Sequence, residues 1–242
     1  MQQYISNYQL LNEIPPGDYH FTGNSAGNKA VIKYVFSGNE GMRTVLDIGF
    51  GVGDLGRIVK TDPATKHWQV DGIDGFHDTC CNLDLFEKRY YRNIWHGLAQ
   101  ELSPEQLKAY DVQCLFDVIE HLDAPGATAL LCKLLESLGP DSRLVLSTPL
   151  WFWPQAQFNP GDLEEHLIAI PSSSLLRLQP HMFTVSSRCM VGTFVFSRRS
   201  LANLEHFKPT ADRNFSLAAG IADLMAMGQK ADDVLYFLQD PH

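Results

Sequence analysis

Apolar and polar residues follow one another in blocks that predict strands and helices in turn. Short apolar runs predict buried strands at residues 44–48, 69–73, 93–96, 111–116 and 143–147. Helical spacing predicts helices at residues 30–36, from about residue 53, over 78–90 and over 124–138. Because parallel neighbours need crossover connections, this alternation favours an α/β fold around a parallel sheet.

The pattern changes after residue 180. Two β-rich pieces, Phe183–Met190 and Thr193–Ser197, are separated by Val191 and Gly192, a gap of hairpin length that predicts antiparallel strands. Beyond residue 200, apolar residues at helical spacing predict two amphipathic helices, around 217–225 and 234–238. We therefore expect an N-terminal cap or lid (1–43), a central α/β domain (44–199) and a helical C-terminal extension (200–242).

Composition narrows the class of protein. The 242 residues are 45% hydrophobic and 19% charged, which is typical of a globular domain with a sizeable core. The net charge of −9 disfavours nucleic acid as a partner, and no apolar run reaches the roughly 20 residues needed to span a bilayer. Five cysteines without the spacing of a disulfide framework fit a reducing compartment, so we expect a cytoplasmic protein.

The stretch VLDIGFGVG at residues 45–53 is the most informative part of the chain. It combines a buried strand with a glycine-rich turn that opens a helix, which is a common way to hold an adenosine-bearing cofactor. The spacing Gly51-x-Gly53-x-x-Gly56, followed by Asp74, matches the dinucleotide fingerprint of NAD(P)-dependent oxidoreductases. The extra glycine at position 49 and the acid at position 47 favour a different family.

Asp47-x-Gly49-x-Gly51-x-Gly53 resembles motif I of the class I S-adenosylmethionine-dependent methyltransferases. The stretches FDVIEHL at 116–122 and LVLSTP at 144–149 resemble the branch that includes the ubiquinone-biosynthesis O-methyltransferases. The resemblance covers about residues 28–198. It implies a Rossmann-like fold whose mostly parallel, seven-stranded sheet ends in an antiparallel hairpin.

The same resemblance implies a binding site for the cofactor. Asp47 would lie near the methionine end of the cofactor, and the glycines would let the chain pass beneath it. Asp74 would accept hydrogen bonds from the ribose hydroxyls, and Phe76 would lie against the adenine. The full set of expected cofactor-binding residues is Asp47, Gly49, Gly51, Gly53, Asp74, Gly75, Phe76, Ala99, Phe116 and Asp117.

Two histidines are the candidate catalytic residues. Methyl transfer is an in-line displacement that needs a base only if the acceptor hydroxyl must lose its proton, and His121 and His166 are the candidates for that base. An alternative is that Glu120 and His121 only hold their loop by hydrogen bonds. A further alternative is that Asp117, Glu120, His121 and His166 bind a divalent metal, an arrangement similar to that of the small-RNA 2′-O-methyltransferases.

The sequence thus predicts an S-adenosylmethionine-dependent methyltransferase that acts on a small-molecule or saccharide acceptor, at oxygen by resemblance. Three alternatives stay open: a metal-assisted RNA 2′-O-methyltransferase, an NAD(P)-dependent oxidoreductase, and a non-catalytic module that binds S-adenosylmethionine. We also expect the C-terminal helices to pack on the domain or to form a homodimer.

Overall fold

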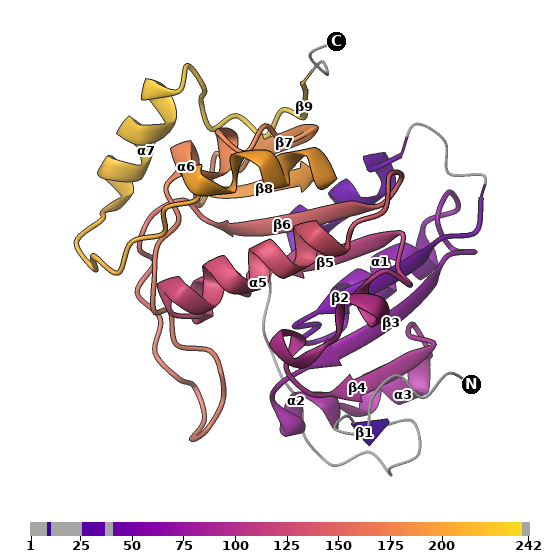
Figure 1. The fold of residues 1–242 in the computed structure, drawn as a ribbon. Coiled ribbons are helices and arrows are strands. Elements are labelled where there is room, and N and C mark those ends of the chain that lie inside the picture. Colours follow the sequence, from indigo (N-terminus) through magenta and orange to yellow (C-terminus); the bar gives the residue numbers. More distant parts are fainter. Residues whose placement is uncertain (1–8, 11–25, 37–40, 239–242) are drawn as a thin grey trace. The chain divides into compact units, whose positions relative to one another are not determined.

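The computed structural model describes residues 9–10, 26–36 and 41–238. The chain divides into two compact units, residues 1–114 and 115–242 (Figure 1), and each is described by itself. Most of the segment 1–43, predicted to form a cap or lid, lies outside the described residues. The predicted domain boundaries stay a prediction.

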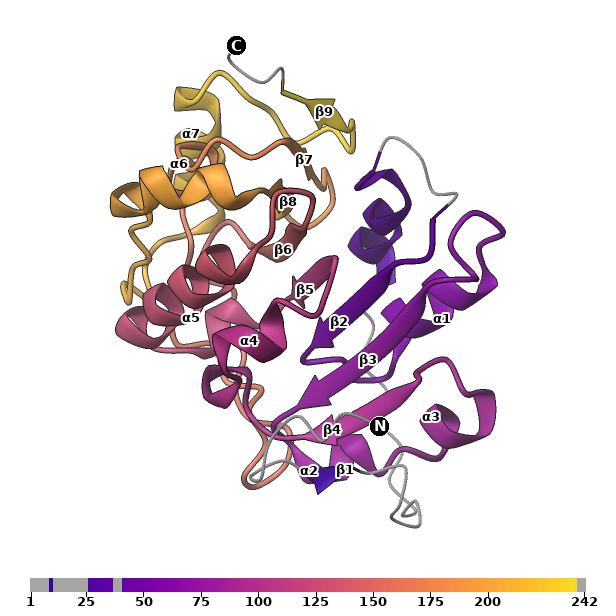
Figure 2. The ribbon, with the colours of Figure 1, turned by 45° about the vertical axis from the view of Figure 1, so that its right-hand side comes forward.

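The first unit contains parallel strands joined by helices. Its strands are β1 (Gln9–Leu10), β2 (Thr44–Ile48), β3 (Gln69–Asp74) and β4 (Asn93–His96), and β5 (Val112–Phe116) leads into the second unit. Its helices are η2 (Ala26–Tyr34), α1 (Asp54–Thr61), α2 (His77–Cys80), α3 (Leu83–Lys88), η3 (Ala99–Glu101) and α4 (Pro104–Leu107). The strands lie in the order β1-β4-β3-β2, with β2, β3 and β4 parallel and β1 antiparallel (Figure 2).

Local sequence explains where these elements begin and end. The last four residues of β2 are buried, as its apolar run predicts, and α1 begins directly after the glycine turn. The single helix predicted over 78–90 is wrong, because α2 ends at Cys80 and a second helix, α3, begins at Leu83 after its Asn82 cap. The Asn82 side chain accepts a hydrogen bond from the backbone N–H of Asp84 at 3.0 Å, a capping contact that favours a new helix over a continuous one.

The second unit is built from antiparallel strands and helices. Its elements are η4 (Ile119–His121), α5 (Ala124–Ser137), β6 (Arg143–Pro149), α6 (Ser172–Leu176), β7 (Met182–Val185), β8 (Val191–Phe196), η5 (Arg198–His206), α7 (Leu217–Ala226) and β9 (Tyr236–Phe237). The strands lie in the order β6-β8-β7-β9, and β8 is antiparallel to both β6 and β7. Helix α5 buries the predicted leucine face and packs on η5.

The predicted hairpin is confirmed, but its turn was misplaced. Val191 and Gly192 belong to β8, and the connection runs over residues 186–190, where Met190 has a positive φ of 53°. Gly192 has a packing role, because a Cβ there would lie 2.5 Å from the Phe194 ring and 3.0 Å from Leu150. The missing side chain makes room within the strand.

The C-terminal prediction is half right. Helix α7 is present, and its Ser216 cap accepts a hydrogen bond from Ala219 N–H at 3.3 Å. The second predicted helix is wrong, because Tyr236–Phe237 forms β9, which pairs with Met182 and Phe183 of β7. The predicted dimer surface therefore retains one of its two helices, and the dimer stays a prediction.

The predicted fold class is confirmed: a Rossmann-like α/β fold in which parallel strands are followed by an antiparallel hairpin. The described residues hold nine strands rather than seven, since the two-residue strands β1 and β9 were not predicted. Among the described residues, no helix is both long and apolar enough to span a membrane.

Candidate functional site

The glycine turn lies in the first unit between β2 and α1. Gly49, Gly51 and Gly53 all have positive φ angles, of 67°, 53° and 81°, a region that L side chains rarely adopt. Gly49 N–H donates to Ile73 O at 2.8 Å, which ties the turn to β3. The positive φ angles explain why these positions are glycine. At Gly51 the space is also open, because a Cβ there would meet nothing within 4 Å.

Asp74 links the glycine turn to the loop after β3. Its Oδ2 accepts from Gly51 N–H at 3.2 Å, and its Oδ1 accepts from Phe76 N–H at 2.9 Å. Burial raises the pKa of Asp74, and these two hydrogen bonds oppose that effect. Each carboxylate oxygen has a second lone pair, so the group still has acceptors to offer a ligand.

The other adenine-side residues lie close in sequence to these strand ends. Gly75 and Phe76 follow β3 and are partly exposed, whereas Ala99 begins η3 after β4 and is buried. Leu98, which stands where the resembled family often has an acid, is 39% exposed. The position is therefore apolar and open to solvent.

Asp47 is a buried carboxylate directly before the turn. Its Oδ2 accepts from the Tyr91 hydroxyl at 2.7 Å, and its Oδ1 has no hydrogen-bond partner among the described residues. Burial raises the pKa of Asp47 to about 6, and the charge of Lys29 and the Tyr91 hydrogen bond oppose the rise. A buried carboxylate oxygen without a hydrogen-bond partner lowers the stability of a fold, so Asp47 is not explained by folding alone.

Tyr91 is a residue of this site that sequence reasoning missed. Besides donating to Asp47, its hydroxyl accepts from Gly56 N–H at 3.2 Å. A Cβ at Gly56 would lie 2.6 Å from the Tyr91 ring, so the glycine of the apparent dinucleotide fingerprint makes room for this ring. A lone tyrosine before a strand carries no motif, and its only sequence signal is the nearby set of glycines.

Two predicted cofactor residues, Phe116 and Asp117, lie at the start of the second unit. Phe116 ends β5 and is buried, and Asp117 follows it with a positive φ of 54°. Asp117 N–H donates to Ser147 O at 2.9 Å, and Ser147 Oγ donates to Asp117 Oδ1 at 2.7 Å. A non-glycine residue held at positive φ is a strained position of the kind that gathers at functional sites.

The second unit brings three of the predicted chemical groups together. Glu120, His121 and His166 each offer a ligand atom, and these atoms lie within 4.8 Å of one another. The two imidazole rings meet edge to face, with centroids 4.6 Å apart. Asp117 does not belong to this cluster, although its charge raises the pKa of Glu120.

Backbone carbonyls orient both imidazoles. His121 Nδ1 lies 3.1 Å from Glu165 O, and His166 Nδ1 lies 2.7 Å from Trp153 O. A carbonyl only accepts, so each Nδ1 carries the proton and each Nε2 keeps its lone pair. Burial lowers the pKa of both histidines, that of His121 to about 4, so both rings are neutral at pH 7.

Glu120 completes the cluster with a buried carboxyl group. It is 2% exposed; its Oε2 accepts from Thr148 Oγ1 at 3.1 Å, and its Oε1 has no partner among the described residues. Its pKa lies well above the usual range, mainly because of burial. The loop-holding alternative has support too, since Leu167 N–H donates to the backbone carbonyl of Glu120 at 2.9 Å.

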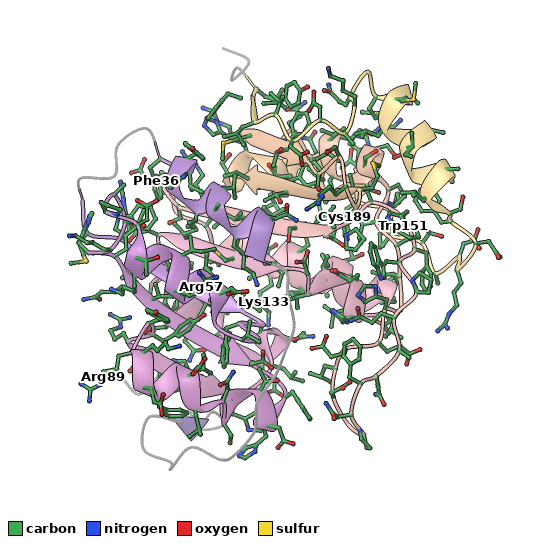
Figure 3. All side chains as sticks on the ribbon, turned by 180° about the vertical axis from the view of Figure 1, so that it is seen from behind. Phe36, Arg57, Arg89, Lys133, Trp151 and Cys189 are labelled. Carbon is green, nitrogen blue, oxygen red and sulfur yellow. The ribbon has the colours of Figure 1, made fainter. Side chains whose placement is uncertain are left out.

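The aromatic residues after β6 divide into two groups. Phe152 is buried, and its N–H donates to Phe215 O at 2.8 Å, whereas Trp151 Nε1 donates to Cys189 O at 3.1 Å (Figure 3). Trp153 is 39% exposed, and its carbonyl orients His166. Trp153 is therefore the residue of this stretch whose ring is open to solvent and whose backbone carbonyl contacts His166.

Comparison with known proteins gives one family. A family model described as a methyltransferase domain matches residues 24–206. This confirms the resemblance to methyltransferases, while the ubiquinone-like branch stays a prediction. The search of curated proteins gave no match.

Solved structures agree on the fold. The mitomycin 7-O-methyltransferase MmcR is 18% identical, with a TM-score of 0.50, over 71% of this chain and 53% of that one. The PH0226 protein from Pyrococcus horikoshii OT3 is 14% identical, with a TM-score of 0.50, over 70% of this chain and 88% of that one. The chain thus matches about half of the length of MmcR. At these identities the likeness shows the fold alone.

Proposed function

The chain belongs to the methyltransferase domain family, and we propose that it moves a methyl group from S-adenosylmethionine to an oxygen of a small-molecule or saccharide acceptor. The observation that carries the proposal is the turn after β2. There, Gly49, Gly51 and Gly53 hold positive φ angles beside the buried Asp47, and Asp74 at the end of the neighbouring parallel strand closes the turn. The choice of oxygen follows the resemblance of residues 116–122 and 144–149 to the O-methyltransferase branch of the family.

We assign binding of the methyl donor to the first unit. The donor carries an ammonium group and a sulfonium, so the carboxylate of Asp47 favours it electrostatically. Asp74 offers the remaining lone pairs of its oxygens to the ribose hydroxyls. Gly51 has room above its Cα, as close passage of a ligand requires.

The family match speaks against the NAD(P)-dependent alternative, because a methyltransferase domain model covers residues 24–206. The third glycine of the apparent fingerprint, Gly56, leaves room for the Tyr91 ring, which lies 2.6 Å from where its Cβ would be. A packing role at this position suits both families, so binding of NAD or NADP has to be tested directly.

We assign to the second unit the base that takes the proton from the methyl acceptor. In the proposed step, the acceptor oxygen attacks the methyl carbon, the carbon–sulfur bond breaks, and its electron pair stays on the sulfur of S-adenosylhomocysteine. The hydroxyl proton goes to Nε2 of His166, whose Nδ1 is already bound to Trp153 O. His121, with a pKa of about 4, is too weak a base for this role at neutral pH and instead packs against His166.

A divalent cation at the same cluster is a second candidate. The ligand atoms of Glu120, His121 and His166 lie within 4.8 Å of one another, and the buried Glu120 Oε1 lacks a partner among the described residues. Both histidines also bond a backbone carbonyl through Nδ1, the usual support of a metal-bound imidazole. A cation there would lower the pKa of an acceptor hydroxyl. We propose Mg²⁺ or Mn²⁺ for this mixed donor set.

Titration calorimetry with S-adenosylhomocysteine, NAD and NADP tests the proposed donor. We expect micromolar binding of S-adenosylhomocysteine alone. Asp74→Asn should weaken it about tenfold, since hydrogen bonds to charged groups contribute about 1.5–3 kcal/mol. Asp111→Asn is the matched control, because Asp111 also accepts a backbone N–H, from Thr44 at 2.8 Å, but away from the turn. Binding of NAD or NADP alone would overturn the proposal.

Calorimetry with MnCl₂ tests the cation separately. We expect binding to the wild type that is lost in Glu120→Gln and kept in Glu105→Gln, a substitution in the short helix α4 of the first unit. The absence of Mn²⁺ binding would leave His166 as the proton acceptor without a metal. Acceptors are then screened with and without the cation, and donor binding without turnover on any of them would favour a non-catalytic binding module.

A further inference from the structure

We infer that Tyr91 is a positioning residue that holds the glycine turn and the carboxylate of Asp47 in place for the methyl donor. The inference rests on the proposed function, because it assigns a role in donor binding. Tyr91 lies in the loop between α3 and β4, and its side chain is buried. It comes from a part of the first unit distant in sequence from the turn, so it fixes the turn through tertiary contacts.

Three glycines leave room for the Tyr91 ring. A Cβ at Gly53 would lie 3.2 Å from it, one at Gly56 would lie 2.6 Å from it, and one at Gly72 would lie 3.1 Å from it. These glycines belong to the turn, to α1 and to β3 respectively. The ring therefore packs among the turn, the first helix and the neighbouring strand, and it shares the space at Gly53 with Leu85 and the space at Gly72 with Phe50.

The hydroxyl of Tyr91 joins the two sides of the turn. It donates to Asp47 Oδ2 at 2.7 Å, at the end of β2, and accepts from Gly56 N–H at 3.2 Å, in the first turn of α1. Burial and the negative charge of Asp47 raise the pKa of Tyr91 well above the usual range, so the hydroxyl keeps its proton and stays a donor. One group thus satisfies a buried carboxylate oxygen and a buried amide at once.

The charges around Asp47 explain why its hydrogen bond with Tyr91 affects binding of the methyl donor. Lys29 of η2 stabilises the carboxylate, whereas Asp74 of β3 and Asp54 of α1 repel it, and the buried Cys114 thiol of β5 stays neutral. The Tyr91 hydrogen bond adds to the effect of Lys29 and holds the Asp47 pKa near 6 against burial. Loss of the hydroxyl would raise that pKa and leave more of the carboxyl neutral at pH 7.

Tyr91→Phe tests the inference because it keeps the ring and removes the two hydrogen bonds. The matched control is Tyr110→Phe, since the Tyr110 hydroxyl donates to another buried carboxylate of the same unit, Asp71, at 2.9 Å. Calorimetry with S-adenosylhomocysteine is run from pH 5.5 to 8.5 on both variants and the wild type. Thermal melts on each sample confirm that it is folded.

We expect Tyr91→Phe to bind about two- to fivefold more weakly at pH 7, because a rise of about one unit in the Asp47 pKa leaves only about half of the carboxyl ionised. Wild-type affinity should fall as the pH drops through about 6, and the fall should begin at higher pH in Tyr91→Phe. Tyr110→Phe should match the wild type in both respects. A merely structural tyrosine would change the melting temperature and leave the pH profile of binding in place.

The outcomes separate this inference from the proposed function. If the wild type does not bind S-adenosylhomocysteine, the proposed function fails. If it binds and Tyr91→Phe shows the same affinity and pH profile, the inference about Tyr91 is overturned. Should Tyr91→Phe not fold, the Gly56 amide resonance of the wild type supplies the measurement: it should titrate near pH 6 and shift on ligand addition, and a constant resonance would overturn the inference.

Discussion

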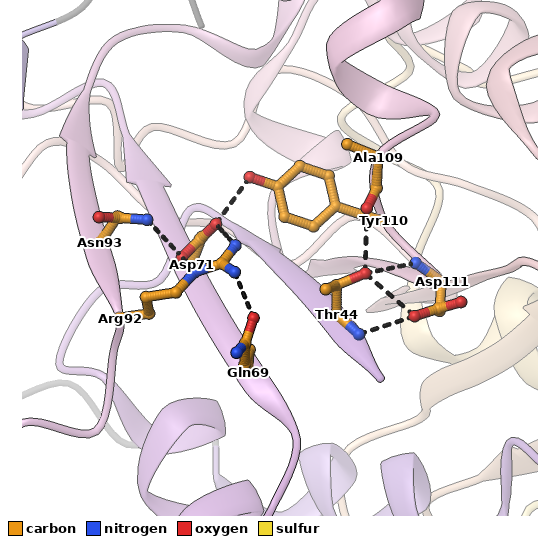
Figure 4. A network of polar contacts seen from close by, with 8 residues as sticks. All are labelled: Thr44, Gln69, Asp71, Arg92, Asn93, Ala109, Tyr110 and Asp111. Atoms are coloured by element: carbon orange, nitrogen blue, oxygen red, sulfur yellow. Dashed lines mark hydrogen bonds and ion pairs between the residues drawn. The ribbon is translucent and has the colours of Figure 1, made fainter. Parts of the chain in front are cut away.

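Two buried carboxylates on neighbouring strands of the first unit differ in how they are paired. Asp71 of β3 accepts from Arg92, Asn93 and Tyr110, and both of its oxygens have donors (Figure 4). The equally buried Asp47 of β2, which lies opposite Gly72 in the register, accepts one hydrogen bond, from Tyr91, and its Oδ1 has no partner among the described residues. Because successive positions of a strand alternate between the two faces of a sheet, these carboxylates lie on opposite faces, one fully paired and the other partly paired.

We infer from this difference that Asp71 belongs to the fold and Asp47 to the proposed ligand site. A buried charge is tolerated at low cost when it is ion-paired and hydrogen-bonded, as Asp71 is with Arg92. A buried carboxylate oxygen without a hydrogen-bond partner lowers stability. Such a group is typical of binding and catalytic sites. In a parallel sheet, ligands bind at the carboxyl ends of the strands, which is where Asp47 and Asp74 lie.

Asp71→Asn should have the largest effect on folding. The substitution removes the charge that pairs with Arg92 and places an amide donor against the donor of either Asn93 or Tyr110. Because the Arg92 side chain is 38% exposed, the loss is that of hydrogen bonds to a charged group, about 1.5–3 kcal/mol for each one broken. Urea unfolding at pH 7 measures the loss, and an unchanged free energy of unfolding would show that the network in Figure 4 does not hold the unit together.

Asp47→Asn should have the opposite effect on stability and leave the free energy of unfolding unchanged or raise it. Because burial raises the Asp47 pKa to about 6, the native state binds this proton more tightly than the unfolded state does, and stability falls as pH rises from about 4 to about 6. Above that range the ionised group destabilises the protein by up to about 3 kcal/mol, which a neutral amide avoids. Urea unfolding at pH 7.5 should therefore show a variant that is as stable as the wild type or more so.

The pH dependence supplies the control for that prediction. The stability gap between Asp47→Asn and the wild type should narrow as the pH falls through 6 and disappear near pH 4. Binding of S-adenosylhomocysteine should be weaker in the variant at pH 7.5, although it is no less stable. A variant that loses stability at every pH would place Asp47 in the same class as Asp71.

Much of this contrast lies beyond what a sequence can predict. The run VLDIG gave β2 its bounds and marked Asp47 as a strand-end acid, because apolar periodicity and glycine turns are local signals. Nothing local says that Asp71 is fully paired and Asp47 only partly, since their partners Arg92 and Tyr91 are neighbours in the same loop. Which tyrosine or arginine reaches which carboxylate is decided by tertiary packing.

The errors in secondary structure have the same origin. Gly192 looked like a turn residue because glycine is typical of turns, whereas its lack of a side chain makes room for Phe194 within β8. The apolar residues around 234–238 suit a helix as well as a strand, and pairing with Phe183 of β7 made Tyr236 part of a strand. Short apolar segments are ambiguous until a partner element is known.

Gly56→Ala should lower the free energy of unfolding by an intermediate amount, and the loss should depend on Tyr91. The new Cβ would lie 2.6 Å from the Tyr91 ring, and overpacking of this kind costs about 1–3 kcal/mol. Urea unfolding should show this loss in the wild-type background and a smaller loss in a Tyr91→Leu background, where the ring is absent. Gly41→Ala is the control, because a Cβ there meets nothing within 4 Å. Equal losses in both backgrounds would mean that Tyr91 does not account for Gly56.

The smallest effect on stability is expected for Asp74→Asn and Asp111→Asn, and these two variants sharpen the comparison most. Each carboxylate accepts a backbone N–H, from Gly51 at 3.2 Å or from Thr44 at 2.8 Å, and an amide oxygen can accept the same bond, so each variant should change the free energy of urea unfolding by less than about 1 kcal/mol. With stability matched, any difference in ligand binding reports the end of the sheet on which the carboxylate lies. Asp74→Asn should lose affinity for S-adenosylhomocysteine while Asp111→Asn keeps it, and equal affinities would mean that the carboxyl ends are not the binding side.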